Sequence, residues 1–206
     1  MSSLYFKYAA MNSGKSTQLI QAHYNYIERG LRPVAMTAQL DNRYGEGKIT
    51  ARIGIDLPAH TFSKTSDIFD VIRALQGRQP VDGLFIDEAQ FLSEAQVFQC
   101  AKIVDELDIP VLAYGLKTDF LGKLFPGSEA LLRLADNIEE IKTICWCGRK
   151  ATQTARLSDG EVVRAGAQIA IGGNDMYTSL CRKHFMSGEL MGGELRAMVE
   201  KIRDAA

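Results

Sequence analysis

Nearly continuous apolar segments, separated by stretches of good helix formers, dominate the chain before residue 144. The apolar segments lie at 4–8, 33–38, 83–87 and 110–116. A strand with this pattern is buried on both faces, as in a parallel sheet that is covered by helices on both sides. The predicted helices lie at 15–29, 67–75 and 94–107. The pattern therefore predicts an α/β domain over residues 1–143.

The pattern changes after Ile144. Short strand-like segments, the turn "SDG" and a long glycine-containing loop predict a small β-rich unit over residues 144–192, and a helical tail follows at 193–206. Residues 41–58 contain three glycines and many polar side chains, which predicts a mobile loop of the kind that often has a functional role.

The composition limits the partners that the chain can be expected to bind. With 206 residues, 46% of them apolar and 24% charged, it suits one ordinary domain with a small addition. The net charge of −1 gives no general excess of lysine and arginine for a nucleic-acid backbone. No apolar run approaches the ~20 residues that span a bilayer, and the N-terminal residues lack the apolar core of a secretion signal. We therefore expect a cytoplasmic protein without a nucleic-acid or membrane partner.

The stretch "AAMNSGKST" at residues 9–17 nearly matches the phosphate-loop pattern GxxxxGK[ST], with Ala9 in place of the first glycine. It lies where a predicted strand meets a predicted helix, so that backbone N–H groups and the helix dipole converge on an anion. Lys15 would contact the β- and γ-phosphates, and the Ser16 hydroxyl would take one magnesium position. A chance match at a helix start is the alternative. Alanine is the least damaging replacement for the glycine unless that position needs a positive φ.

A second motif, "LFIDEAQF", places Asp87 and Glu88 at the end of an apolar strand. Phosphate-loop proteins hold a magnesium-supporting carboxylate at such a position. Because neighbouring residues of a strand point in opposite directions, Asp87 is predicted to face the metal and Glu88 the phosphoryl acceptor. We predict that Glu88 is the general base that takes the proton of the acceptor hydroxyl.

Three cysteines and a histidine form a CxC pair followed by CxxH: Cys145, Cys147, Cys181 and His184. This set supplies the ligands of a tetrahedral, closed and therefore structural zinc site. The alternative is three buried free cysteines and a surface histidine. Cys100, on a predicted helix, is expected to lie in the core. His23 and His60 are expected to be structural or exposed.

Together these motifs resemble those of the thymidine kinases of the cellular, zinc-containing type, a family of many bacteria, animals and some large DNA viruses. The resemblance covers nearly the whole chain and rests on "MNSGKST", "DEAQF", "YGLKTDF", "CWCGRKA" and "GNDMYTSLCRKHF". The CxC pair is similar to the bacterial form, and the family accepts small residues at the position of Ala9. The resemblance implies a P-loop (RecA-like) parallel sheet flanked by helices, with a small β-rich zinc-binding domain that carries a lasso loop.

The resemblance also implies an activity, namely transfer of the γ-phosphoryl group of ATP to the 5′-hydroxyl of thymidine, giving dTMP in nucleotide salvage. The implied ATP-binding residues are Ala9, Ala10, Met11, Asn12, Ser13, Gly14, Lys15, Ser16, Asp87, Glu88, Ala89 and Gln90, with Ser16 and Asp87 at the magnesium ion. The loop residues Asp41 and Arg43 would approach the phosphates. The implied thymidine-binding residues are Met11, Phe91, Leu116, Phe120, Gln168, Ile169, Ala170, Ile171, Gly172, Gly173 and Tyr177. The resemblance further implies a homotetramer or dimer and inhibition by dTTP.

Two other classes of function remain open at this point. A P-loop ATPase or zinc-ribbon module that acts on nucleic acid would need a basic, aromatic face, whereas the charge is balanced and only 8% of residues are aromatic. A regulatory nucleotide-binding protein without turnover would have little need for Glu88 beside the metal carboxylate. Without the resemblance, the apolar candidates in the substrate set would be assigned to the core.

Overall fold

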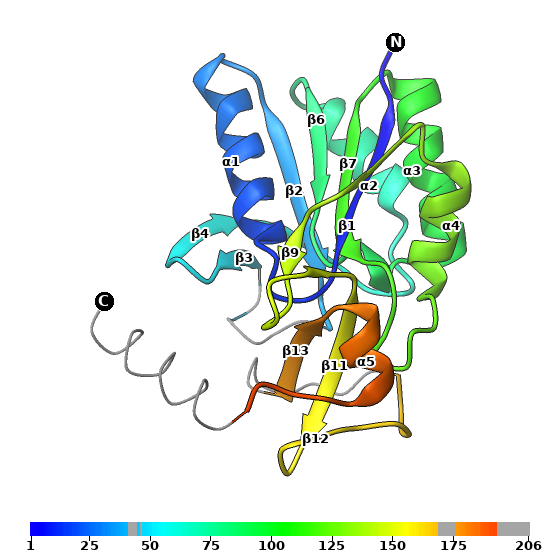
Figure 1. Ribbon diagram of the computed structural model, residues 1–206. Helices are drawn as coiled ribbons and strands as arrows, with labels where there is room; N and C mark the ends of the chain where they lie inside the picture. The colour runs from blue at the N-terminus through cyan, green and yellow to red at the C-terminus, as the bar shows by residue number, and fades with distance from the viewer. Residues whose placement is uncertain (41–44, 46, 169–175, 193–206) are drawn as a thin grey trace.

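A six-stranded sheet, parallel at every pairing, forms the centre of the computed structural model (Figure 1), which describes residues 1–40, 45, 47–168 and 176–192. Its strand order is β5-β2-β6-β7-β1-β8. The strands are β1 (Leu4–Ala9), β2 (Pro33–Ala38), β5 (His60–Phe62), β6 (Gly83–Ile86), β7 (Val111–Leu116) and β8 (Asn137–Glu140). The prediction of a parallel sheet from the apolar segments is confirmed.

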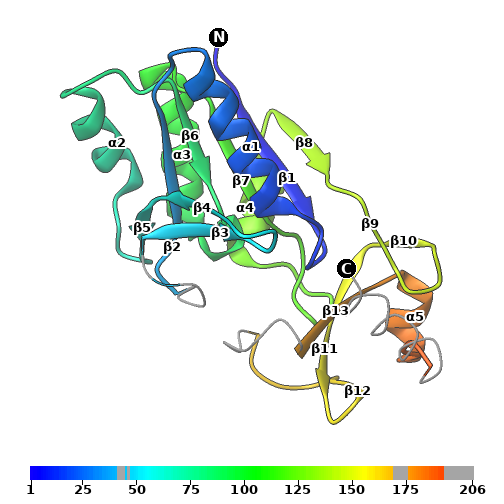
Figure 2. The ribbon, with the colours of Figure 1, turned by 90° about the vertical axis from the view of Figure 1, so that its left-hand side faces the viewer.

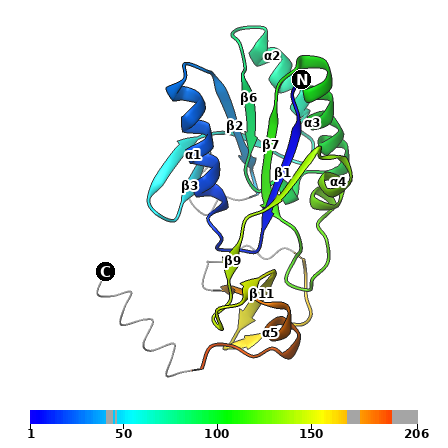
Figure 3. The same ribbon diagram turned by 45° about the horizontal axis from the view of Figure 1, so that its top comes forward.

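Helices cover both faces of this sheet (Figure 3). They are α1 (Lys15–Glu28), α2 (Ile68–Gln76), α3 (Glu94–Leu107) and α4 (Pro126–Leu134). Leu84 and Ile86 of β6 pack with α2, α3 and α4, whereas Phe85 between them packs with α1 on the opposite face. The strand is apolar without interruption because both of its faces are buried.

The predicted helices at 15–29, 67–75 and 94–107 agree with α1, α2 and α3 to within one residue at every end. Asp67 caps α2 by accepting a hydrogen bond from the Asp70 N–H. Ser93 and Gln96 form a reciprocal capping box at the start of α3. Sequence patterns missed α4, which is short, and β8, which is an edge strand with mostly exposed residues.

The prediction of a loop at 41–58 is wrong for its second part. Residues 48–58 form an antiparallel hairpin of β3 (Lys48–Ala51) and β4 (Ile55–Pro58). Ile49 and Ala51 are buried in the cluster that lies under α1, so tertiary packing orders this segment. Residues 41–44 and 46 lie outside the described residues.

A small antiparallel unit lies beyond the end of the sheet at which β1 terminates (Figures 1 and 2). Its elements are β9 (Thr143–Ile144), β10 (Lys150–Ala151), β11 (Gln153–Ser158), β12 (Glu161–Val162), β13 (Tyr177–Leu180) and α5 (Arg182–Ser187). It has a core of its own, in which Ala155, Leu180 and Phe185 pack around two of the cysteines. The β-rich character predicted for this region is confirmed, while its exact boundaries remain a prediction. The expected tail helix at 193–206 lies outside the described residues.

Among the described residues, no helix combines the length and apolar character that a membrane crossing requires.

Gly127 in α4 provides a test of how tightly this helix packs against η1 (Ala89–Phe91). A Cβ atom there would lie 2.6 Å from the Leu92 carbonyl oxygen and 2.7 Å from that of Ala89. We expect Gly127→Ala to lower the free energy of unfolding by about 1–2 kcal/mol, because overpacking outweighs the gain in helix propensity. Thermal unfolding should show a fall in Tm of about 2–8 °C.

The matched control is Gly77→Ala, at the end of α2. Its Cβ would meet atoms no closer than 3.5 Å, and Gly77 has a right-handed helical conformation. We expect no loss of stability there. An equal loss for both variants would contradict the packing argument.

Candidate active site

The phosphate loop connects the end of β1 to the start of α1. Gly14 has a φ of +80°, which glycine adopts readily, and it directly precedes the first residue of the helix. Ala9 instead lies in the extended backbone of β1, opposite Leu116 of β7. The position where the usual pattern has its first glycine therefore does not need a positive φ, which explains why alanine is tolerated.

Lys15 and Ser13 of this loop have the surroundings expected of phosphate ligands. Lys15 is buried and its Nζ donates to the carbonyl oxygen of Ala10 at 3.2 Å. The Ser13 hydroxyl is buried and has no hydrogen-bond partner within the part of the chain that the structure describes. A phosphate oxygen in the loop would satisfy this hydroxyl, because buried polar groups are normally hydrogen-bonded.

The two predicted magnesium ligands are in direct contact. Ser16 Oγ donates to Asp87 Oδ2 at 2.7 Å, although the residues are far apart in sequence. Asp87 is buried, and its other carboxylate oxygen accepts the Glu88 N–H at 3.0 Å. A hydroxyl and a carboxylate in contact at a phosphate loop fit Mg²⁺, which prefers oxygen ligands.

Glu88 lies beside Asp87, but the reason differs from the one that the sequence indicated. Strand β6 ends at Ile86, so the alternation of a strand does not separate the two acids. Glu88 has a left-handed backbone, with φ 53° and ψ 37°, which is uncommon for a residue other than glycine. Its carboxylate accepts a hydrogen bond from the Gln90 side-chain amide.

A cavity lies over the phosphate loop, and most of the predicted ATP-binding residues line it. The predicted residues among its walls are Met11, Asn12, Ser13, Gly14, Lys15, Ser16, Asp87 and Glu88. Ala9, Ala10, Ala89 and Gln90 are buried and are not part of its wall. Asp41 and Arg43 lie outside the described residues.

Two cations in this cavity wall, Lys48 and Arg52, were missed by the sequence analysis. Both belong to the hairpin region, and Arg52 donates a hydrogen bond to the side-chain oxygen of Asn12 in the phosphate loop. The alternation of apolar and polar residues in "KITA" and "IDLP", on either side of Gly54, is the signal that could have identified the hairpin.

A second cavity, of about 620 Å³, is adjacent to the first, since Thr37 lines the first and Ala38, the next residue, lines the second. The predicted substrate-binding residues Phe91 and Gln168 line it, together with Gln90 and with Phe125, which the sequence analysis missed. The rings of Phe91 and Phe125 meet edge to face with centroids 6.0 Å apart. An aromatic wall of this kind suits a nucleoside base.

Among the other predicted substrate-binding residues, those that the structure describes are not part of the wall of the second cavity. Leu116 donates its backbone N–H to Gln90, and Phe120 is buried beneath the Arg156 guanidinium, 3.6 Å from the ring centroid. Tyr177 begins β13 and is paired with Arg156. Ile169, Ala170, Ile171, Gly172 and Gly173 lie outside the described residues.

The small β unit holds the phosphate loop at Met11. The Met11 N–H donates to Thr154 Oγ1 at 3.0 Å, and the Met11 carbonyl oxygen accepts a hydrogen bond from the Ser179 hydroxyl. Thr154 of β11 and Ser179 of β13 are directly opposite each other in the antiparallel pair. One cross-strand pair of hydroxyls therefore binds both backbone groups of a residue in the phosphate loop.

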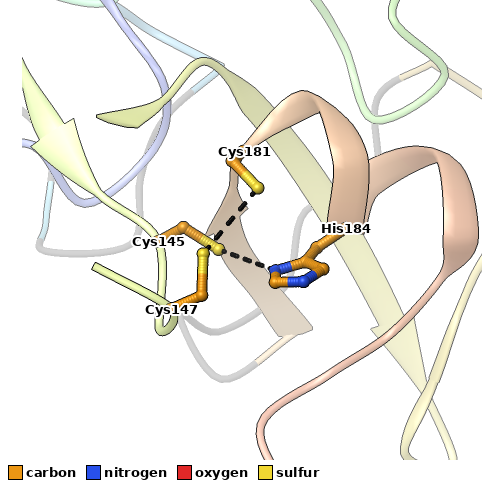
Figure 4. A group of neighbouring side chains, drawn as sticks. All are labelled: Cys145, Cys147, Cys181 and His184. Carbon is orange, nitrogen blue, oxygen red and sulfur yellow. Dashed lines mark hydrogen bonds between the residues drawn. The ribbon is translucent and has the colours of Figure 1, made fainter. Parts of the chain in front are cut away.

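The four predicted zinc ligands come together in the same unit (Figure 4). Their ligand atoms all lie within 4.8 Å of one another, with Cys145 Sγ 3.5 Å from His184 Nδ1 and Cys147 Sγ 3.9 Å from Cys181 Sγ. Tetrahedral zinc with ordinary bond lengths has S···N and S···S edges of about 3.5 and 3.8 Å. The cluster is consistent with a structural zinc site, and the alternative of a surface histidine is wrong because His184 is buried.

Neighbouring groups orient two of these ligands. The indole of Trp146 stacks on the His184 ring, with centroids 4.4 Å apart and planes 9° from parallel. The backbone N–H of His184, in the first turn of α5, lowers the pKa of the Cys181 thiol. A lower pKa favours the thiolate, which is the form that binds zinc.

The remaining cysteine and histidines have structural or surface positions, as expected. Cys100 is fully buried in α3, and burial raises the pKa of its thiol to about 12. His23 packs edge to face on Phe85, and burial lowers the pKa of its imidazole. His60 is exposed.

A parallel sheet with a phosphate loop after β1 and an aspartate after β6 defines a protein of the P-loop class. Within this class the chain belongs to the thymidine kinase family, because the family model described as thymidine kinase matches residues 2–185. Proteins named thymidine kinase from Salmonella typhimurium and Escherichia coli O157:H7 are each 50% identical over 204 residues, covering 98% of this chain and 99% of theirs. One from Agrobacterium fabrum is 54% identical over 187 residues, covering 90% of this chain and 97% of its own.

The metal cluster leads to a prediction about folding. We expect the protein to contain about one zinc ion per chain and Cys181→Ser to lose it, with unfolding or aggregation, because structural zinc contributes directly to folding. Elemental analysis and circular dichroism would measure both effects. Cys100→Ala is the matched cysteine control and should retain the metal. Retention of zinc by Cys181→Ser would show that the ligand set is wrong.

The contact at Met11 leads to a separate prediction. Removing the Ser179 hydroxyl should loosen the phosphate loop by about one hydrogen bond, so we expect Ser179→Ala to raise the KM for ATP about 2- to 10-fold. The zinc content should stay the same, since no ligand is changed. Ser158→Ala, at the exposed end of β11 where this strand pairs with β12, should leave the KM unaltered. An unchanged KM in Ser179→Ala would mean that this contact does not influence nucleotide binding.

Proposed function

We propose that the protein transfers the γ-phosphoryl group of ATP to the 5′-hydroxyl of thymidine, which gives dTMP and ADP in nucleotide salvage. Membership of the thymidine kinase family and the near full-length similarity to bacterial relatives support this proposal. The observation that carries it is the position of Glu88. Glu88 lines the cavity over the phosphate loop, and its hydrogen-bond partner Gln90 lines the aromatic cavity beside it. A carboxylate at this junction lies where donor and acceptor would meet.

The donor side would work by binding and charge neutralisation. The backbone N–H groups of the loop, the Lys15 ammonium and the Ser13 hydroxyl would bind the phosphates of ATP. A Mg²⁺ ion held by Ser16 and Asp87 would neutralise the negative charge that develops on them. Lys48 and Arg52 add positive charge to the same wall. Phosphoryl transfer requires this positioning more than it requires covalent participation by the protein.

The acceptor side would use Glu88 as a general base. Its carboxylate would accept the proton of the 5′-hydroxyl while that oxygen forms a bond to the γ-phosphorus and the bond to the ADP oxygen breaks. The thymine ring of the substrate would be held against Phe91 and Phe125. We further propose, from the family resemblance, that main-chain groups of residues 168–173 bind the edge of the base and that Met11, Leu116, Phe120 and Tyr177 complete its surroundings.

The remaining assignments follow from the same resemblance. Zinc would stabilise the unit at 144–192, beside the nucleotide-binding unit at 1–143, without taking part in the chemistry. We propose a homotetramer or a dimer with dTTP as an end-product inhibitor. We also propose a cytoplasmic location, where ATP and deoxynucleotides are used for DNA synthesis.

The first test is an assay with Mg-ATP and a panel of thymidine, deoxyuridine, deoxycytidine and uridine, in which each nucleoside monophosphate is detected directly. We expect thymidine to be phosphorylated in preference to the others. Absence of any monophosphate, together with ATP hydrolysis stimulated by single-stranded DNA, would replace this proposal with an ATPase that acts on nucleic acid.

The role of Glu88 leads to a specific prediction. Loss of a general base typically costs about 10²–10⁴-fold in rate, so Glu88→Gln should lower kcat by this factor. ATP affinity, measured by equilibrium binding, should stay within about 2-fold because the phosphate loop is unchanged. Glu106→Gln, at an exposed position of α3, is the matched control and should be fully active. Wild-type kcat in Glu88→Gln would exclude Glu88 as the base.

A further inference from the structure

Gln90 is almost completely buried, at 1% exposure, and its side chain lies between the carboxylate of Glu88 and the end of β7. Its Oε1 accepts the backbone N–H of Leu116 at 2.9 Å, and its Nε2 donates to Glu88 Oε2. The amide therefore connects the carboxylate of Glu88 to the backbone of a neighbouring strand. The family resemblance placed Gln90 among the ATP-binding residues, whereas its side chain is directed toward Glu88.

The orientation of this amide is determined by its partners. A backbone N–H is only a donor, so the oxygen of Gln90 must face Leu116. The NH₂ group must then face Glu88, and an ionised carboxylate can only accept. The two contacts are compatible with one orientation of the amide, so Gln90 offers Glu88 a donor in a fixed position.

The neighbouring residues are shaped to accommodate this amide. A Cβ atom on Gly115 would lie 2.8 Å from Gln90 Oε1 and 3.0 Å from its backbone nitrogen. On the far side, the Ser128 hydroxyl of α4 donates to the Leu116 carbonyl oxygen at 2.6 Å. The backbone that receives Gln90 is thus itself held in place, and only glycine at position 115 leaves room for the amide.

Glu88 requires such support because its backbone has the left-handed conformation described above. A residue other than glycine stays in this conformation only when its surroundings determine it, at a cost of order 1–3 kcal/mol. Asp87 Oδ1 accepts the Glu88 N–H, which fixes the backbone. The Gln90 amide fixes the carboxylate at the end of the same side chain.

We propose that Gln90 is a positioning residue for phosphoryl transfer, which holds the Glu88 carboxylate at the junction of the two cavities. This inference rests on the proposed function. The hydrogen bonds between Gln90 and Leu116 and between Ser128 and Leu116 connect the Glu88 carboxylate to the carboxyl end of β7 and to α4. Gln90 would act through Glu88, since its side chain donates to that carboxylate and is not part of the wall of the cavity over the phosphate loop.

The decisive experiment is a double-mutant cycle between Gln90→Met and Glu88→Gln. Methionine has a similar length but no amide, and a misplacement of about 1 Å can cost on the order of 100-fold in rate. We expect Gln90→Met to lower kcat about 10- to 100-fold in the otherwise wild-type protein. In the Glu88→Gln background the same change should alter the residual kcat less than about 2-fold, because the group that it positions is already gone.

Gly115→Ala provides a second variant that leaves Gln90 itself in place. The added methyl group should displace the amide, so the loss of kcat should again disappear in the Glu88→Gln background. This variant keeps the proposal testable if Gln90→Met does not fold.

Gln99→Met is the matched control. Gln99 is a half-buried glutamine of α3 whose Oε1 accepts the Ile68 N–H at 2.9 Å, and neither residue lines either cavity. Loss of the Gln99 amide should reduce stability and leave kcat unchanged. Independent, multiplying effects of Gln90→Met and Glu88→Gln, or a wild-type kcat in Gln90→Met, would overturn the positioning role. A wild-type protein that makes no dTMP would instead overturn the proposed function.

Discussion

Parallel pairing of the central strands is the constraint on which the proposed site depends. β1 and β6 both pair with β7 in the parallel direction, so the chain that follows each strand emerges at the same end of the sheet, where the strands have their carboxyl ends. This brings the phosphate loop after β1 close to the acids after β6, and the Ser16–Asp87 hydrogen bond joins them. Each strand can run this way because helices cover both faces and bury its apolar side chains.

The small β unit that contains the Cys3His cluster is joined to the carboxyl ends of the strands rather than to the body of the sheet. Thr154 and Ser179 hold both backbone groups of Met11, and Cys181 follows Ser179 closely in the chain. The Cys3His cluster, which is consistent with structural zinc, is thereby connected to the phosphate loop through β13.

Local patterns in the sequence predicted much of the fold and the metal cluster, but not all of the site. The apolar runs and the two short ligand motifs, CxC at Cys145 and CxxH at Cys181, are local signals, and the structure contains each of them. The hairpin that supplies Lys48 and Arg52 was missed because its buried face, at Ile49, depends on packing beneath α1. Phe125 could not be assigned to the second cavity, since nothing in its neighbourhood indicates that it meets Phe91.

The sequence by itself determined the class of fold, the residue types that can hold phosphate and metal, and the family. Those properties depend on residue type and on spacing within short motifs, which the linear sequence contains. The tertiary structure decided how Glu88 is held. Its left-handed backbone, its contact with Gln90 and the space that Gly115 leaves arise only when the ends of β6 and β7 meet. Close approach between separate segments determines such details, and a linear pattern does not record it.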